Sequence, residues 1–291
     1  MKRYTITDFN KDFPNDNACL EWLRNHLYPE GIFCGKCGKV TKHHRITTRR
    51  SYSCDVCGHH VHPTAGTIFE KSSTPLKLWF HAIYLMSSTR CGISAKQIER
   101  ETGVTYKTAW RMFKQIRSML EEDHNKMSGH VEADETYIGG KRHGKRGRGA
   151  EGKTPVVGIA QRNGKIMATA IPNVKAKTLL PMIKERVLPD AIIYTDELPS
   201  YNRLSSMGYV HRRIHHALKV YVMGDAHTNT IEGFWSLLKR GISGVYHAVS
   251  EKYLQNYLNE YTFRYNHRAD IQPLFKTFLY QVAERPSLMS L

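Results

Sequence analysis

The sequence contains no long apolar run, and none of its 291 residues lies in a stretch that approaches the length of a membrane-spanning helix. Its first residues, MKRYTITDFNKDFP, lack the apolar core of a secretory signal peptide, and no lipidation signal or amphipathic anchor is recognisable. No P-loop or dinucleotide fingerprint is present, so ATP-driven chemistry is not indicated. We therefore expect a soluble intracellular protein with no membrane partner.

Acidic residues are also scarce. The chain has 26 Asp and Glu against 43 Lys and Arg, which gives a formal net charge of +17 and a pI of about 9.6. Such an excess of cations predicts a polyanionic partner, and nucleic acid is favoured over membrane. The hydrophobic content of 41% and charged content of 24% are ordinary for a globular protein, which argues against wholesale disorder.

The sequence has only six cysteines, and four of them form two Cys-x-x-Cys pairs, Cys34 with Cys37 and Cys54 with Cys57. Sixteen residues separate the pairs, a spacing typical of a four-cysteine zinc ribbon. Because all four ligands come from the protein, no coordination position is open for a catalytic water. We predict a structural Zn²⁺ site in a ribbon that touches nucleic acid.

Residues 74–120 read as helical, with Pro75 opening the first helix. Ser94 is placed to cap a second helix, Gly103 lies in a short turn, and Thr105 starts a third helix that buries Ala109, Trp110 and Phe113. This spacing is typical of a helix-turn-helix, although a plain helical hairpin in a small bundle would have the same pattern. With the basic charge and the adjacent ribbon, we favour DNA contact. The residues expected in the major groove are Thr105, Tyr106, Lys107, Thr108 and Arg111.

Residues 125–270 alternate between strand-like and helical patterns. Strands are expected near 130–140, 155–160, 165–171 and 191–195, and helices over 176–187 and 251–267. The order predicts a mixed sheet with helices packed on it, an α/β arrangement. A loop rich in glycine and cations follows the first strand and suits a phosphate backbone, although a merely solubilising loop is a serious alternative. Its candidate DNA-binding residues are Lys141, Arg142, Lys145, Arg146 and Arg148.

Two aspartates lie at strand-like segments. Asp134 sits on the first strand, and Asp196 directly follows a buried one. If the two strands are neighbours in the sheet, both carboxylates project at the same edge, where Glu232 from a later helix can join them. Three gathered carboxylates need hard cations to offset their repulsion, which indicates Mg²⁺, with Mn²⁺ as a substitute. Two such ions can support an in-line phosphoryl displacement.

The segment HTNTIEGFWSLLK, residues 227–239, predicts a docked helix whose apolar stripe runs through Ile231 and Trp235. Glu232 and Lys239 stand two turns apart on one face beside this stripe. An alternative without chemistry makes Asn229 the N-cap and Glu232 its capping-box partner. Other residues compete for the metal site, namely Glu132, Asp225 and His227; Glu135 is expected to point to the opposite side of its strand.

These segments together resemble a bacterial insertion-sequence transposase of the DDE class, and more narrowly the ISXO-type subgroup. The similarity covers about residues 15–268 and is strongest in VEADETYIGG, IIYTDE, HTNTIEGFWSLLKRGI and FRYNHR. The 35 residues between Asp196 and Glu232, and a lysine seven residues further on, match the pattern of this class. The resemblance implies that Asp134, Asp196 and Glu232 bind metal and that Lys239 contacts DNA. Because some relatives use asparagine as the third ligand, Asn229 is a second candidate.

The resemblance further implies a multi-domain α/β protein in which an RNase H-like catalytic domain follows a zinc ribbon and a helix-turn-helix. We expect a helical lead-in (1–30), the ribbon (31–66), the helix-turn-helix (67–124), the catalytic domain (125–270) and a C-terminal tail (271–291).

The expected function is binding of terminal inverted repeats, cleavage at the element ends and joining of the 3′-hydroxyls to target DNA. No motif is broken, so an active enzyme is expected. It would act as a homodimer or larger assembly on double-stranded DNA in the bacterial cytoplasm, associated with the nucleoid. The alternatives are a non-catalytic regulator that binds DNA, and a nuclease of the same fold that cuts without joining.

Overall fold

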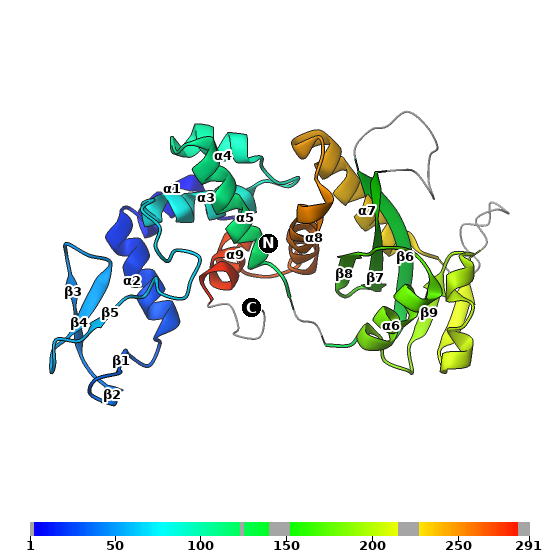
Figure 1. Ribbon diagram of the computed structural model, residues 1–291, viewed down its shortest axis with the longest axis horizontal. Helices are drawn as coiled ribbons and strands as arrows, with labels where there is room; N and C mark the ends of the chain where they lie inside the picture. The colour runs from blue at the N-terminus through cyan, green and yellow to red at the C-terminus, as the bar shows by residue number, and fades with distance from the viewer. Residues whose placement is uncertain (1–2, 123–124, 140–151, 215–226, 285–291) are drawn as a thin grey trace. The chain divides into compact units, whose positions relative to one another are not determined.

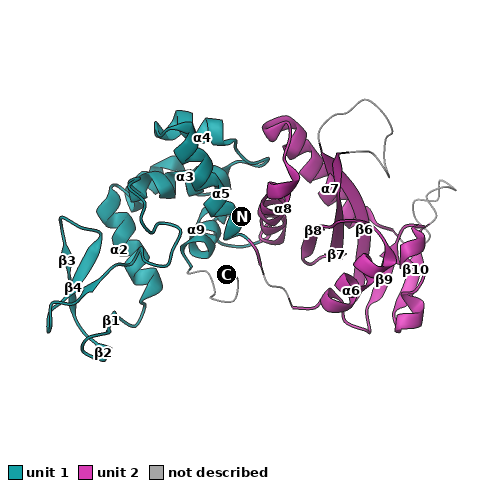
Figure 2. Cartoon of the chain, viewed as in Figure 1, with its two compact units in different colours: residues 1–120, 270–291 teal, residues 121–269 magenta. Residues whose placement is uncertain are grey.

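The computed structural model describes residues 3–122, 125–139, 152–214 and 227–284. The chain divides into two compact units (Figure 2). Residues 1–120 and 270–291 form one, and residues 121–269 form the other. The division falls after residue 120, close to residue 124, where we expected the helix-turn-helix domain to end. None of the helices within the described ranges is long and apolar enough to cross a membrane.

The first unit is built around α3, which spans Leu76–Ser88 and begins after Pro75 as expected. Against α3 pack α2, α4, α5 and α9. The helical bounds in this unit are α1 Ile6–Asp12, α2 Asp16–Leu27, α4 Ala95–Thr102, α5 Tyr106–Ser118 and α9 Leu274–Ala283. Asn15 caps α2, and its side chain accepts a hydrogen bond from the Ala18 amide.

The C-terminal residues differ from expectation. We expected a tail after residue 270, but Leu274–Ala283 form the helix α9, whose face with Phe275, Phe278 and Leu279 is buried in the first unit. Pro273 precedes the helix, as proline commonly does at a first turn. Helical lead-in, cysteine-rich segment, helix pair and C-terminal helix therefore share one unit rather than forming separate domains.

The cysteine-rich segment forms two small antiparallel sheets in Figure 1. One pairs β1 (Phe33–Cys34) with β2 (Lys39–Val40). The other pairs β3 (His43–Ile46), β4 (Ser51–Cys54) and β5 (His60–Val61) in that order, so β3 and β4 form a hairpin between the cysteine pairs.

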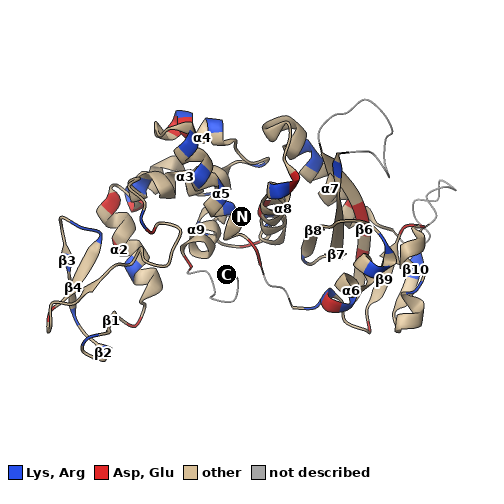
Figure 3. Cartoon of the chain, viewed as in Figure 1, with Lys and Arg blue, Asp and Glu red and all other residues tan. Residues whose placement is uncertain are grey.

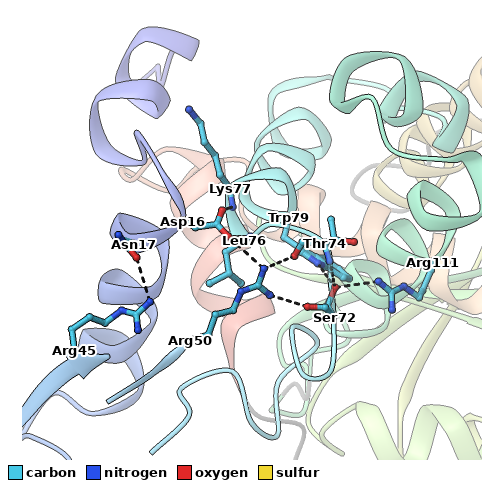
Figure 4. A network of polar contacts seen from close by, with 10 residues as sticks. All are labelled: Asp16, Asn17, Arg45, Arg50, Ser72, Thr74, Leu76, Lys77, Trp79 and Arg111. Carbon is cyan, nitrogen blue, oxygen red and sulfur yellow. Dashed lines mark hydrogen bonds and ion pairs between the residues drawn. The ribbon is translucent and has the colours of Figure 1, made fainter. Parts of the chain in front are cut away.

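A polar network ties this segment to the helices (Figure 4). The Asp16 carboxylate accepts hydrogen bonds from the Leu76 and Lys77 amides, each at 3.0 Å, and so caps α3 from outside that helix. The same carboxylate lies 3.4 Å from Arg50, whose guanidinium also donates to the carbonyls of Ser72 and Thr74. One arginine from the ribbon thus links α2 to the start of α3.

The second unit is a five-stranded mixed sheet in the order β10-β9-β6-β7-β8. β6, β7 and β8 follow one another in the sequence and form an antiparallel meander. β9 runs parallel to β6, and β10 runs parallel to β9. The strand bounds are β6 His130–Gly139, β7 Lys153–Gln161, β8 Ile166–Ala170, β9 Ile192–Thr195 and β10 Val210–Arg213. The sequence predicted the first four strands but not β10.

Helices cover both faces of this sheet. Residues of α6 (Ala176–Arg186) and of the 3-10 turn Pro199–Tyr201 share a core with Val131, Val157 and Ile193. On the other face, α7 (Asn229–Gly241) and α8 (Glu251–Asn266) share a core with Ile138 and Val156. A single π-helical turn, Ile242–Tyr246, continues α7, and a second 3-10 turn spans Ser205–Met207.

Candidate active site

Two neighbouring parallel strands carry the predicted aspartates. The β6–β9 register pairs Glu132 with Tyr194, and two further residues along both strands bring Asp134 beside Asp196. Oxygens of Asp134, Asp196 and Glu135 lie within 4.8 Å of one another. The sheet therefore gathers the two predicted aspartates, one within β6 and one directly after β9, together with a third carboxylate. Figure 3 marks the acidic positions on β6.

Glu135 belongs to this cluster although alternation along the strand directs it to the opposite face. Its Oε2 accepts a hydrogen bond from the buried Tyr201 hydroxyl at 3.1 Å, on the α6 side. One oxygen of this long side chain nevertheless lies within 4.8 Å of oxygens of Asp134 and Asp196. The alternation along a strand fixes only the direction of the Cα–Cβ bond. The two methylene groups of a glutamate allow its carboxylate to reach a different position.

The surroundings of Asp134 disfavour the ionised form of its carboxyl group. Burial, followed by the charges of Glu135 and Asp196, raises the pKa of its carboxyl to about 7. The Asp196 Oδ1 accepts the Leu198 amide at 2.9 Å, which orients that side chain at the end of β9. Three close carboxylates are the oxygen donor set that Mg²⁺ and Mn²⁺ prefer. The residues present therefore fit a divalent cation.

Helix α7 docks directly above Asp134. Ile231, Phe234, Trp235 and Leu238 are buried, so the predicted apolar stripe is confirmed. The Trp235 indole nitrogen donates to Asp134 Oδ2 at 3.0 Å. Gly158 lies opposite Asp134 on β7, and a Cβ atom there would come within 2.5 Å of both Ile231 and Trp235. The glycine lets α7 approach the sheet closely.

The capping-box interpretation of α7 is wrong. Its N-cap is Thr228, not Asn229, and no side-chain cap bond forms there. The Thr228 hydroxyl instead donates to Glu232 Oε1 at 2.7 Å. Glu232 and Lys239 are both exposed on α7. Among the described residues, the compact acidic cluster comprises Asp134, Glu135 and Asp196, and the Glu232 carboxylate is not part of it.

The competing residues have different places. Glu132 is fully buried, beneath the first turn of α7. His227 Nδ1 lies 3.3 Å from Glu132 Oε1, so it faces that carboxylate. Asn229 is exposed in the first helical turn. Asp225 and the basic-loop residues Lys141, Arg142, Lys145, Arg146 and Arg148 lie outside the described residues.

The four cysteines form the predicted cluster, with all sulfurs within 4.8 Å of one another. Cys34 and Cys57 lie 3.5 Å apart and Cys37 and Cys54 3.9 Å, close to the ~3.8 Å edge of a tetrahedron with Zn–S bonds of ~2.3 Å. The Thr41 hydroxyl lowers the pKa of Cys54 to about 6, whereas neighbouring sulfurs, Cys57 first, raise that of Cys37 to about 12. A cation such as Zn²⁺ would remove this conflict, so the residues fit the ion.

The helix pair α4–α5 has the predicted caps. Ser94 accepts from the Gln97 amide, Thr105 accepts from the Thr108 amide, and Gly103 adopts φ +72° in the turn. Ala109 and Phe113 are buried, but Trp110 is only half-buried, contrary to expectation. Tyr106 and Lys107 are exposed, while Arg111 donates to the Ser72 hydroxyl at 3.2 Å, as Figure 4 shows.

Two residues at the site escaped sequence reasoning. Trp235 was assigned only to the apolar stripe; the signal was its indole N–H, which needs an acceptor when the ring is buried. Arg162 was not singled out in the sequence, yet its Nε donates to Glu132 at 2.9 Å and its guanidinium stacks 4.1 Å from the Tyr194 ring centre. No local pattern in the sequence marks that contact.

The sequence matches two protein-family models and the sequences of known proteins. Residues 126–266 match the ISXO2-like transposase domain, and residues 14–60 match the transposase zinc-ribbon domain. An uncharacterized protein in transposable element ISH50 of Halobacterium salinarum is 29% identical over 275 residues, which cover 87% of this chain and 92% of that protein. An uncharacterized transposase-like protein of Haemophilus influenzae is 34% identical over 102 residues, which cover 35% of this chain and 81% of that protein.

Solved structures give looser matches. A simian T-cell lymphotropic virus intasome in complex with a PP2A regulatory subunit matches with a TM-score of 0.33 and 16% identity, covering 72% of this chain and 75% of that chain. The Mos1 transposase paired-end complex with the left transposon end matches with a TM-score of 0.32 and 13% identity, covering 74% and 79%. Both scores are too low to bear on function. The two matched domains and the relatives show instead, on sequence, that the chain belongs to the ISXO2-like family of insertion-sequence transposases.

Proposed function

We propose that the protein is a DDE transposase that binds the terminal inverted repeats of its element, cleaves at the ends and joins them to target DNA. The observation that carries this proposal is the closeness of Asp134, on β6, and Asp196, which directly follows the neighbouring parallel strand β9, with carboxylate oxygens within 4.8 Å of one another. The second unit would be the RNase H-like catalytic domain of this class.

In the proposed reaction, water attacks a phosphodiester at the element end and releases a 3′-hydroxyl opposite a 5′-phosphate. The 3′-hydroxyl then attacks a target phosphodiester, and a target 3′-oxygen leaves. One phosphodiester forms as one breaks in the second step, so no external energy source is needed. Bound Mg²⁺ or Mn²⁺ would activate the attacking oxygen and stabilise the leaving one.

The protein residues would divide the work. Asp134 and Asp196 hold the metal, and Glu135 joins or supports them from the same edge. Glu232, exposed on α7, would complete the ligands when DNA and metal are present, and Lys239 two turns on would contact the DNA end. In this proposal Glu232 is the third metal ligand, and Asn229 is the alternative candidate for the same position.

DNA binding is proposed for the first unit. The start of α5 presents Tyr106, 50% exposed, and Lys107, as a helix-turn-helix recognition helix would. Thr105 and Thr108 take part in the N-cap of α5. They would therefore contribute to DNA binding by fixing the backbone at the start of this helix. Lys107→Ala should weaken binding to all sequences and reduce the salt slope by about 1, and an unchanged slope would count against this surface. The control is Lys177→Ala, which removes an exposed lysine on α6.

The catalytic half is tested by end cleavage. Purified protein with Mg²⁺ and labelled terminal-repeat duplexes should nick the element end, and Asp134→Ala should abolish nicking while duplex binding persists. Glu185→Ala removes a carboxylate that is 66% exposed on α6 and should cleave normally. Undiminished cleavage by Asp134→Ala would overturn the proposal. Binding without any cleavage by folded wild-type protein would favour the non-catalytic regulator.

A further inference from the structure

Glu132 is a fully buried carboxylate whose partners all converge on the start of α7. Its Oε2 accepts the Ile231 amide at 3.0 Å, and its Oε1 accepts the Thr230 hydroxyl at 3.0 Å. Arg162 donates to the same Oε1 at 2.9 Å and also to the His227 carbonyl at 2.6 Å. A strand side chain and a hairpin arginine thus hold both the first helical turn and the residue that leads into it.

Helix α7 needs this outside partner. Its N-cap Thr228 makes no side-chain cap bond; the Thr228 hydroxyl donates to Glu232. The amide of Ile231, the third residue of the helix, therefore lacks a local acceptor, and an unsatisfied buried amide is costly. Glu132 supplies the acceptor from the sheet, and its negative charge also suits the positive end of the helix dipole.

A second contact lies one turn further on. Asp134, two residues along β6, accepts from Trp235, four residues along α7. Two strand residues advance ~6.7 Å and four helical residues ~6 Å, so the two pairs match in spacing. An apolar stripe on its own permits a helix to slide or rotate, whereas two matched polar contacts define a single register.

We propose that Glu132 is a positioning residue that sets the register of α7 on the sheet, and so fixes the place on α7 from which Glu232 would reach the Asp134–Asp196 site when metal and DNA are bound. This inference rests on the proposed function, in which Glu232 is a metal ligand. Glu132 itself does not touch the metal; its two oxygens are occupied by the partners described above.

Divalent-ion affinity gives a test that does not depend on DNA cleavage. Free Mn²⁺ can be titrated by electron paramagnetic resonance against the zinc-loaded full chain. Glu132→Gln should weaken Mn²⁺ binding 10- to 100-fold, the usual loss when an outer partner of a metal ligand is removed. Thermal unfolding and zinc content identify any variant that has lost its fold.

Two comparisons separate positioning from charge or simple stability. Glu132→Asp keeps the charge for Arg162 but is one methylene too short for the Ile231 amide, so it should lose Mn²⁺ affinity almost as fully as Glu132→Gln. The double variant Glu132→Gln/Glu232→Gln should bind no more weakly than Glu232→Gln alone, because Glu132 acts through Glu232. Additive losses, or full affinity in Glu132→Asp, would overturn the inference.

The control outcomes are distinct. If Glu232→Gln leaves Mn²⁺ affinity unchanged, the ligand assignment in the proposed function fails, and the inference about placing that ligand fails with it. If Glu232→Gln weakens binding and Glu132→Gln does not, only the inference fails. In the unaltered chain, the Ile231 amide should exchange with solvent more slowly than those of Asn229 and Thr230; equal exchange would contradict the cap even if every variant misfolds.

Discussion

The indole nitrogen of Trp235 donates a hydrogen bond to Asp134 Oδ2 at 3.0 Å, which joins α7 to the first predicted metal ligand. This bond lowers the pKa of Asp134, against the larger raising effects of burial and of the neighbouring carboxylates. The tryptophan therefore serves both the packing of α7 and the charge balance of the acidic cluster.

Trp235→Phe keeps an aromatic ring but removes the N–H donor. We expect about 1 kcal/mol less stability, the net value of a typical hydrogen bond, and roughly 10-fold slower end cleavage, because Asp134 is less well oriented. Denaturant unfolding and timed cleavage measure the two effects. Trp22→Phe, in the aromatic cluster with Phe13 and Phe80, is the control and should cleave normally. Equal cleavage by both variants would contradict a role for the N–H.

Gly158→Ala tests the close approach of α7 to the sheet. The added Cβ would lie 2.5 Å from atoms of Ile231 and Trp235, so the helix must shift. We expect a loss of about 1–3 kcal/mol, as in other overpacked cores, together with weaker Mn²⁺ binding.

Gly233→Ala is the matched control, because that glycine lies on α7 and a Cβ there meets no atom within 4 Å. Alanine is the better helix former, so this variant should gain about 0.5–1 kcal/mol and keep its Mn²⁺ affinity. If both variants behave alike, α7 tolerates displacement and its tight docking is unimportant.

The sequence predicted the parts of this site that depend on short-range periodicity. The apolar stripe of α7 and the buried strand before Asp196 could be found because burial of one helix face or a whole strand leaves a regular pattern. It did not reveal β10, since Val210–Arg213 is mostly exposed and polar at the sheet edge. Contacts across the sheet were also hidden: nothing local to Glu132 indicates that it caps a helix 99 residues away.

The acidic cluster predicts a pH-dependent stability. The pKa of Asp134 is raised from 3.8 to about 7 in the fold, so ionising it costs folding free energy. That cost is absent below about pH 4, grows as pH rises to about 7 and is constant above. Without added divalent ions, the melting temperature of Asp134→Asn minus that of wild type should increase over this range.

Added Mg²⁺ should remove much of the difference above pH 7 by stabilising the ionised wild-type site. Asp190→Asn, at an exposed position in the turn before β9, is the matched control for the removal of one carboxylate. A difference between Asp134→Asn and wild type that is flat from pH 4 to pH 8 would show that the Asp134 carboxyl is not strained.

The cysteine cluster predicts one zinc ion per chain. Cys54→Ser removes the sulfur that lies 3.1 Å from the Thr41 hydroxyl and should release the zinc, with a loss of cooperative unfolding in the first unit. Zinc released by thiol modification, counted with a colorimetric chelator, gives the stoichiometry. Cys91→Ser, at an exposed position, should retain one ion. Full zinc content in Cys54→Ser would show that this sulfur is not a ligand.

Strand transfer is the central claim, and it is tested by joining. Precut terminal-repeat duplexes with a free 3′-hydroxyl are incubated with Mg²⁺, protein and a supercoiled target plasmid. We predict covalently joined products with wild-type protein and none with Asp196→Asn or Glu232→Ala, although both variants bind the duplex. Cleaved but never joined DNA would identify a nuclease, and joining that survives Asp196→Asn would contradict the account of the site.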